Sequence, residues 1–323
     1  MYNFSIVFLL YSAYKNITFV IQKLIKMNKN IVVIGAGTMG NGIAHVFAQN
    51  NFTVDLVDVN KNSLNNSIKI INKNLDRLIE KEKITDEIKE LTLNNISTHS
   101  NIKSSKKDSF IVIEVASENL DLKLKIFEEA DRFYNQNTII ATNTSSISIT
   151  KIASVTKRSD RVIGMHFMNP VPIMKLVEII KGYDTSQKTL ITVKKLTEDI
   201  KKIAIEVNDY PGFIANRILL PMINEAIESL HHGVGTVKSI DSIMKLGMGH
   251  PMGPLQLADF IGLDICLSIL EVMYKGFNKE KYAPSPLLVK MVDAGKLGIK
   301  SGEGFYDYSK IKKAEFISNQ FKS

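Results

Sequence analysis

A histidine and a glutamate, His166 and Glu178, are the residues of this chain best suited to acid–base chemistry. They lie in the segment GMHFMNPVPIMKLVEII, where the apolar stretches 161–167 and 175–180 predict two strands joined by a proline-containing turn. Residues 166 and 178 lie equally far from Pro172, so a hairpin folded about that residue places 166 opposite 178. A carboxylate bonded to one imidazole nitrogen fixes the tautomer and raises the basicity of the other nitrogen. The spacing therefore predicts a general base with an orienting partner; a surface ion pair or a hydrogen-bonded core histidine is the alternative interpretation.

A glycine-rich loop earlier in the chain predicts a dinucleotide site. Gly35, Gly37 and Gly40 form the pattern G-x-G-x-x-G, with Thr38 and Met39 inside it, directly between a predicted strand and a helical pattern. In that context the first glycine allows a tight turn, the second admits a pyrophosphate close to the backbone, and the third permits close packing of helix on strand. The N-terminus of the helix adds amide donors for the anion.

Asp58 strengthens this prediction because it ends the next predicted strand, where a carboxylate binds the ribose hydroxyls of such a cofactor. A 2′-phosphate would meet like charge there, so Asp58 favours NAD over NADP, although Lys61 nearby leaves NADP open. Beside a nicotinamide site, we interpret His166 and Glu178 as catalytic rather than structural.

The composition is that of an ordinary globular protein: 323 residues, 45% apolar and 23% charged, which is enough for two domains. The net charge of +8 comes from dispersed lysines, and no basic run with interleaved aromatic residues marks a nucleic-acid groove, so we expect no nucleic-acid partner. The single cysteine, Cys266, fits a reducing compartment and a cytoplasmic location. The histidines other than His166 are scattered, with His99 expected in a polar loop, and no metal site is predicted.

Residues 1–26 form an extension of doubtful status. Ser5–Tyr11 is apolar but lacks the basic flank and cleavage site of a signal peptide, and Lys15 and Lys23 interrupt any membrane-spanning stretch. Met27 is a natural start for a protein that opens on a strand. We therefore interpret the extension as the result of an upstream start codon assigned in error, with a membrane tether as the alternative.

Alternating strands and helices predict an α/β domain with a Rossmann-like, doubly wound parallel sheet. The predicted strands are 30–34, 53–58, 110–114 and 138–142, with a helix at 121–133. A polar insertion from 60 to about 91 predicts two helices that project as an arm, with a turn near Lys83. From Gly212 onward the helical spacing of apolar residues predicts an all-α C-terminal domain. The domains are placed at 27–208 and 209–311, followed by a tail, 312–323.

Ordered motifs along nearly the whole chain, from about Met27 to Lys310, resemble those of the L-3-hydroxyacyl-CoA dehydrogenase family. They include VIGAGTMGNGIA, NTSSISIT, GMHFMNPVPIMKLVEII, PGFIANRILLPMINEA, HPMGPLQLADFIGLDICL and GIKSGEGFYDY. The resemblance, strongest for the bacterial 3-hydroxybutyryl-CoA dehydrogenases, implies a homodimeric, NAD-dependent enzyme that is not membrane-bound. Its implied reaction interconverts (S)-3-hydroxybutyryl-CoA, a short-chain L-3-hydroxyacyl-CoA, and acetoacetyl-CoA.

Carried over by position, the resemblance implies that His166 is the catalytic base and Glu178 its orienting partner. It further implies contacts with the cofactor or the substrate from Ser145, Asn169, Asn216, Glu118, Lys123 and Lys300. The serine, the asparagines and a protonated His166 suit the reaction, because a keto oxygen that gains negative charge needs hydrogen-bond donors. Structural alternatives are that Ser145 caps a helix starting at 146–149, that Asn216 is a packing residue and that Glu118 is a first-turn helix charge.

The helical arm meets coenzyme A in the family, and Lys81 is the candidate contact in this chain. Asp76, Glu80 and Glu82 depart from the more basic or neutral family pattern, so a solvated helix face is the alternative. Two other functions stay open: a dehydrogenase of a free hydroxy acid or sugar acid, and a catalytically silent NAD-binding protein. An activity that requires the CoA moiety would distinguish this enzyme from a dehydrogenase of a free acid. The intact set of candidate catalytic residues argues against a silent NAD-binding protein.

Overall fold

The computed structural model describes residues 30–311 and 313–322, which form two compact units. The sheet unit comprises the described residues up to Thr144 together with Ser148–Asp209. The helical unit comprises Ser145–Ile147 and the described residues from Tyr210 onward. The predictions for residues 1–26 lie outside the described part of the chain.

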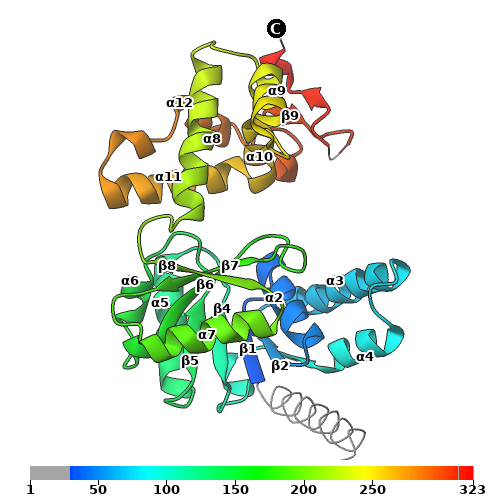
Figure 1. Cartoon of the computed structure of the whole chain (residues 1–323), viewed down its shortest axis with the longest axis vertical. Helices are drawn as coiled ribbons and strands as arrows, with labels where there is room; N and C mark the ends of the chain where they lie inside the picture. Colours follow the sequence, from blue (N-terminus) through cyan, green and yellow to red (C-terminus); the bar gives the residue numbers. More distant parts are fainter. Residues whose placement is uncertain (1–29, 312, 323) are drawn as a thin grey trace, which may run out of the picture. The chain divides into compact units, whose positions relative to one another are not determined.

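The sheet unit is built on eight strands in the order β3-β2-β1-β4-β5-β6-β7-β8 (Figure 1). Their bounds are β1 (Asn30–Ile34), β2 (Thr53–Val57), β3 (Ile96–His99), β4 (Ile111–Glu114), β5 (Ile139–Thr142), β6 (Val162–Phe167), β7 (Leu176–Lys181) and β8 (Ile203–Asn208). β1 pairs in parallel with both β2 and β4, whereas β6 and β7 are antiparallel. The doubly wound, Rossmann-like sheet is thus confirmed. Its strand order reverses beside β1, where open α/β sheets bind ligands at the carboxyl ends of the strands.

The prediction of a polar loop at His99 is wrong, because residues 96–99 form the edge strand β3. The strand has the sequence ISTH, with one aliphatic residue and no buried side chain, so it lacks the apolar run that indicates a strand. Pairing with β2 defines it instead. The Nε2 atom of His99 lies 3.3 Å from a carboxylate oxygen of Asp55 on β2.

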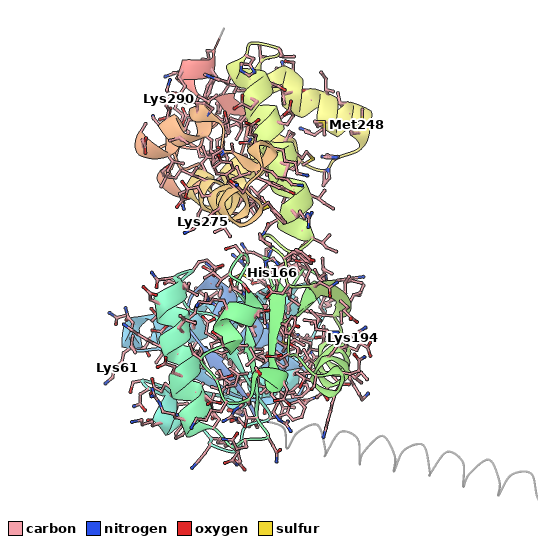
Figure 2. All side chains as sticks on the ribbon, turned by 90° about the vertical axis from the view of Figure 1, so that its left-hand side faces the viewer. Lys61, His166, Lys194, Met248, Lys275 and Lys290 are labelled. Carbon is pink, nitrogen blue, oxygen red and sulfur yellow. The ribbon has the colours of Figure 1, made fainter. Side chains whose placement is uncertain are left out.

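Helices cover both faces of this sheet. They are α2 (Thr38–Gln49), α5 (Leu120–Phe133), α6 (Ile149–Ala153) and α7 (Gln187–Asp199), with short 3-10 turns at Ile102–Ser104 and Ser159–Arg161. Figure 2 shows α7, which carries Lys194, on one side of the sheet and α5 on the other. On the side of α2 and α7, apolar side chains of the strands form a continuous buried core with the inner faces of these two helices.

The predicted arm is confirmed as two helices, α3 (Lys61–Glu80) and α4 (Asp86–Asn94), which extend away from the sheet (Figure 1). Ile71 and Leu75 bury the inner stripe of α3, and its N-terminus is capped by the side chain of Asn60. Asp76 of α3 accepts a hydrogen bond from the Lys89 ammonium of α4 at 2.5 Å. The acidic departure at position 76 therefore ties the two arm helices together.

One buried histidine gives the sheet unit an acid-sensitive core. His45, on α2, is fully buried, and neither ring nitrogen has a hydrogen-bond partner among the described residues. Burial lowers the pKa of His45 from 6.5 to about 4. The folded protein therefore binds fewer protons than the unfolded chain between these two values, and stability falls as the pH falls through this window.

We expect His45→Leu to remove this contribution. We compare the free energies of unfolding of the variant and the wild type at two pH values. The difference, variant minus wild type, should be about 2 kcal/mol more positive at about pH 4.5 than at about pH 7.5. Urea unfolding of both proteins at the two pH values measures the difference. A variant whose stability relative to the wild type is the same at both pH values would contradict a buried neutral imidazole.

The helical unit contains α8 (Ala215–His231), α9 (Val237–Met248), α10 (Pro254–Ile261), α11 (Leu263–Phe277) and α12 (Pro286–Asp293). Three 3-10 turns (Glu280–Tyr282, Ile299–Ser301 and Asn319–Phe321) and a short hairpin of β9 (Tyr306–Asp307) and β10 (Phe316–Ile317) complete it. The helical C-terminal domain is confirmed, although the hairpin was not predicted because each of its strands has only two residues. Cys266 is buried in the core of this unit.

Candidate active site

The three loop glycines are required for three different reasons. Gly35 has a φ of +112°, and a Cβ atom there would lie 2.7 Å from the carbonyl oxygen of Val115 on the loop after β4. A Cβ atom on Gly40 would lie 1.8 Å from the carbonyl oxygen of Gly35, so α2 packs directly on the turn. A Cβ atom on Gly37 would have no protein atom within 4 Å, so this backbone faces open space at the N-terminus of α2. That arrangement suits an anion bound to helix amides.

This contrast yields a matched pair of substitutions. We expect Gly40→Ala to destabilise the protein by about 3 kcal/mol or more, because the added methyl group overlaps backbone that cannot move independently. Gly37→Ala should leave stability within about 1 kcal/mol of the wild type but weaken NADH binding by roughly tenfold or more, because the methyl group takes the place of the phosphate. Thermal unfolding and NADH fluorescence titration separate the two effects. Equal NADH affinity of Gly37→Ala and the wild type would contradict this assignment.

A cavity of about 680 Å³ opens at this loop, within the size range of ligand sites. Thr38, Met39 and Asp58 line it, together with Val115 and Ser117 from the segment after β4. The Asp58 carboxylate accepts hydrogen bonds from the backbone N–H of Ala36 at 2.7 Å and of Asn60 at 2.8 Å. Asp58 thus holds the glycine loop in place and also lines the cavity, where its charge disfavours a 2′-phosphate.

A buried ion pair supports the opposite wall. Lys123, 1% exposed, donates to both carboxylate oxygens of Glu114 at 2.8 and 3.0 Å and to the carbonyl oxygen of Ala116. Glu114 also accepts from the Thr142 hydroxyl at 2.7 Å. This network joins the ends of β4 and β5 to α5, so the Lys123 ammonium fixes the loop that lines the cavity.

Sequence reasoning missed Glu114, which was recognised only as the end of a strand. The available signal was an acidic residue at the end of a buried strand, followed by a lysine in the next helix. Glu118 precedes the N-cap of α5, Asn119, so it is not a first-turn helix charge. Its carboxylate accepts from the Thr144 hydroxyl and lies 3.5 Å from the Lys123 ammonium.

His166 and Glu178 face each other across β6 and β7, in the predicted register. The Nδ1 atom of His166 lies 2.8 Å from an Oε atom of Glu178, and the two side chains are 8% and 3% exposed. Burial excludes the surface ion pair. The carboxylate at Nδ1 favours a proton on that nitrogen, which leaves Nε2 as the basic atom. Figure 2 shows His166 near the end of its strand, and the adjacent Phe167 donates its backbone N–H to the Asn143 side chain at 2.9 Å.

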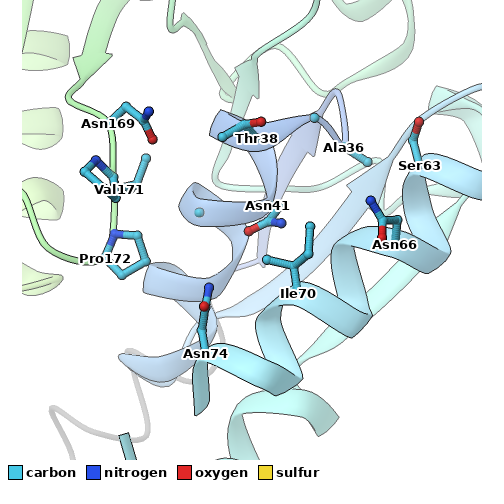
Figure 3. Close-up of a pocket in the computed structure, with 13 residues that line it drawn as sticks. Ala36, Thr38, Asn41, Ser63, Asn66, Ile70, Asn74, Asn169, Val171 and Pro172 are labelled. Carbon is cyan, nitrogen blue, oxygen red and sulfur yellow. The ribbon is translucent and has the colours of Figure 1, made fainter. Parts of the chain in front are cut away.

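The loop between β6 and β7 forms one wall of a second cavity, of about 300 Å³ (Figure 3). Asn169, Val171 and Pro172 from this loop face the N-terminal half of α2 and the side chains along α3. The polar side chains around it are uncharged amides and hydroxyls, from Thr38, Asn41, Ser63, Asn66, Asn74 and Asn169. Asn169 therefore lies beside the glycine loop, at a second cavity in the same unit.

The helical unit holds the other candidates. The Asn216 side chain, buried at the start of α8, donates to the carbonyl oxygen of Ser145 at 3.0 Å, so these two residues are brought together. Ser148, not Ser145, caps α6. Lys300 forms an ion pair with Asp264. The roles of all three candidates remain predictions.

Lys81 follows the last turn of α3 as its C-cap and is exposed, so both the CoA contact and the solvated face stay open. Within residues 30–311 and 313–322, no group of three or more His, Cys, Asp or Glu side chains is arranged to hold a metal ion. No helix in that same part of the chain is long and apolar enough to span a membrane.

Comparison with known proteins identifies the family. Residues 30–210 match the NAD-binding domain of 3-hydroxyacyl-CoA dehydrogenases, and residues 212–308 match their C-terminal domain. The 3-hydroxybutyryl-CoA dehydrogenase of Bradyrhizobium diazoefficiens is 50% identical over 284 residues, which cover 88% of this chain and 97% of the relative. The enzyme of that name from Clostridioides difficile is 47% identical over 280 residues, covering 87% and 99%. The crystal structure of (S)-3-hydroxybutyryl-CoA dehydrogenase from Ralstonia eutropha has a TM-score of 0.84 and 48% identity, covering 87% of this chain and 99% of that one. The chain therefore belongs to the 3-hydroxyacyl-CoA dehydrogenase family.

Proposed function

We propose that this enzyme interconverts (S)-3-hydroxybutyryl-CoA and acetoacetyl-CoA with NAD, through acid–base catalysis by His166. The observation that carries the proposal is the buried His166–Glu178 pair at 2.8 Å, in the same unit as the glycine-loop cavity. The nicotinamide of the cofactor carries the hydride to or from C3 of the substrate. The chain itself must then move one proton at the oxygen on C3.

His166 is the residue that moves this proton. In the oxidative direction its Nε2 atom accepts the proton of the 3-hydroxyl while hydride leaves C3. Glu178, bonded to Nδ1, stabilises the imidazolium that forms and keeps Nε2 aimed at the substrate. In the reductive direction the imidazolium returns the proton to the keto oxygen, so one pair serves both directions.

Ser145 and Asn216 are proposed to stabilise charge on the substrate oxygen. The hydrogen bond from Asn216 to the Ser145 carbonyl fixes the backbone at Ser145, so its hydroxyl needs little reorganisation when charge develops. On the cofactor side, we propose Glu118, Lys123, Asn169 and Lys300 as contacts. For Lys123, the burial of its ammonium favours a role in shaping the cavity wall.

The second cavity favours a CoA ester over a free hydroxy acid. None of the 13 residues around it is charged, and Ile70, Val171 and Pro172 add apolar surface (Figure 3). A free carboxylate buried there would lack a cationic partner, at a cost of several kcal/mol. The amide-bearing, uncharged arm of a CoA thioester matches a wall of amides and hydroxyls. Lys81 is proposed as a contact to the phosphates of CoA.

We also propose that the enzyme is a cytoplasmic homodimer. The helical unit exposes large apolar side chains that would be buried against a second copy, among them Ile218 (68%), Ile243 (60%), Leu246 (86%) and Met248 (64%). The one cysteine is buried and needs no oxidising compartment.

The decisive assay is the loss of NADH absorbance with acetoacetyl-CoA, run beside free acetoacetate and repeated with NADPH. The proposal predicts turnover of the CoA ester with NADH, little turnover of the free acid, and weaker use of NADPH because of Asp58. Turnover of the free acid alone would establish a hydroxy-acid dehydrogenase instead. Absence of turnover in a protein that binds NADH would contradict the enzymatic function.

A further inference from the structure

Lys202, immediately before β8, is a buried cation bonded to the loop between β6 and β7. Its side chain is 7% exposed, and its ammonium donates to the carbonyl oxygens of Val171 at 2.6 Å and Met174 at 2.7 Å. Both acceptors are backbone atoms of the same loop. Among residues 30–311 and 313–322, no carboxylate forms an ion pair with it.

The burial of the Lys202 ammonium is energetically unfavourable, which argues that the interaction has a function. Removing an ammonium group from water is unfavourable, and burial accordingly lowers the pKa of Lys202. Two carbonyl dipoles compensate part of that cost, and they do so only while the loop keeps its present conformation. The ammonium of Lys202 therefore keeps its hydrogen-bond acceptors only while the loop holds its present conformation, and this dependence stabilises that conformation.

The loop is also held from the side of α2. Val171 is 2% exposed and packs on Gly42, where an added Cβ atom would lie 2.8 Å from the Cβ of Val171. The backbone N–H groups of Ile173 and Met174 both donate to the carbonyl oxygen of Pro170, which closes the turn. Packing on α2 and hydrogen bonding to Lys202 thus fix a loop whose tip, at Ile173, is 73% exposed.

We propose that Lys202 is a positioning residue for substrate binding: its ammonium holds residues 169–174 in the shape that forms the wall of the cavity in Figure 3. This inference rests on the proposed function, in which the cavity receives the arm of the CoA ester. Lys202 acts on binding rather than on proton transfer, because His166 and Glu178 are held by the strand pairing of β6 and β7.

The test compares Lys202→Met with Lys201→Met. Both replace a lysine by a side chain of similar length without donors, but Lys201 is exposed, so it is the matched control. At a temperature well below the melting point of each variant, Lys202→Met should raise KM for acetoacetyl-CoA roughly tenfold while kcat changes less than about threefold. Hydrogen exchange should accelerate at the amides of Ile173 and Met174 but not in β6 or β7. Lys201→Met should match the wild type in both measurements.

A purely structural role of Lys202 predicts a different result. Lys202→Met would then have a lower melting temperature, but its KM and the hydrogen-exchange rates of its loop amides would equal those of the wild type. That result would overturn the proposal. If Lys202→Met does not fold, Gly42→Ala provides the second test, because its methyl group displaces Val171 from the other side. A stable Gly42→Ala variant with raised KM and faster loop exchange supports control of binding by the loop, and unchanged KM refutes it. Failure of the wild type to turn over the CoA ester would instead refute the proposed function.

Discussion

Replacing His166 by Gln is expected to reduce kcat for acetoacetyl-CoA about a thousandfold, within the range for loss of a general acid–base group. Glutamine fills similar space and keeps a hydrogen bond to Glu178, so the paired strands should stay folded, but its amide cannot exchange a proton with the substrate. The affinity for NADH should change less than about threefold, because the glycine loop is untouched. Stopped-flow or steady-state NADH oxidation, with a fluorescence titration for binding, measures both quantities.

His231→Gln is the control for this experiment, because His231 is exposed at the end of α8. It should retain wild-type kcat. A His166→Gln enzyme with kcat within about tenfold of the wild type would show that another group or solvent moves the proton, since a general acid–base residue contributes more than that.

Glu178→Gln is expected to give the second largest loss, roughly a hundredfold or more in kcat. The substitution keeps the size of the side chain but removes the negative charge that stabilises the imidazolium, and its amide nitrogen supports the wrong tautomer of His166. If Glu178 acts through His166, as proposed, the double variant should be no slower than His166→Gln alone, within about threefold. Steady-state kinetics of the wild type, the two single variants and the double variant give the double-mutant cycle that tests this.

Glu206→Gln on the neighbouring strand β8 is the matched control, because this exposed glutamate pairs with Lys194 at a distance of 3.4 Å and should not affect kcat. If the losses of the two single variants multiplied in the double variant, Glu178 would have a role independent of His166.

The hairpin register and the glycine loop were predictable because each depends on local sequence. The register across a single turn follows from two neighbouring apolar stretches in which residues 166 and 178 lie equally far from Pro172, and the glycine spacing reflects backbone geometry within a few residues. The buried parallel strands were predictable for a similar reason, because both faces are covered and the sequence shows a continuous apolar run.

The remaining features depend on contacts between distant residues. The edge strand β3 exists through its pairing with β2 rather than through its own composition. Glu114 acquires its role from Lys123 and Thr142, and Lys202 from carbonyl oxygens about thirty residues earlier in the chain. A single sequence contains these residues but gives no indication that they meet. The same applies to Asp76, whose pairing with Lys89 explains an acidic residue that the family resemblance left unexplained.

The antiparallel pairing of β6 with β7 has a consequence for how such an enzyme diverges. Parallel neighbours would need a crossover of a dozen or more residues, usually a helix, between His166 and Glu178. Here both groups are encoded in one short stretch of the gene, on either side of a single turn. Recombination with a homologous gene therefore transfers His166 and Glu178, the proposed proton-transfer pair, together or not at all, unless the breakpoint falls within that stretch. Chimeras can exchange the arm or the helical unit while inheriting the proposed acid–base pair intact.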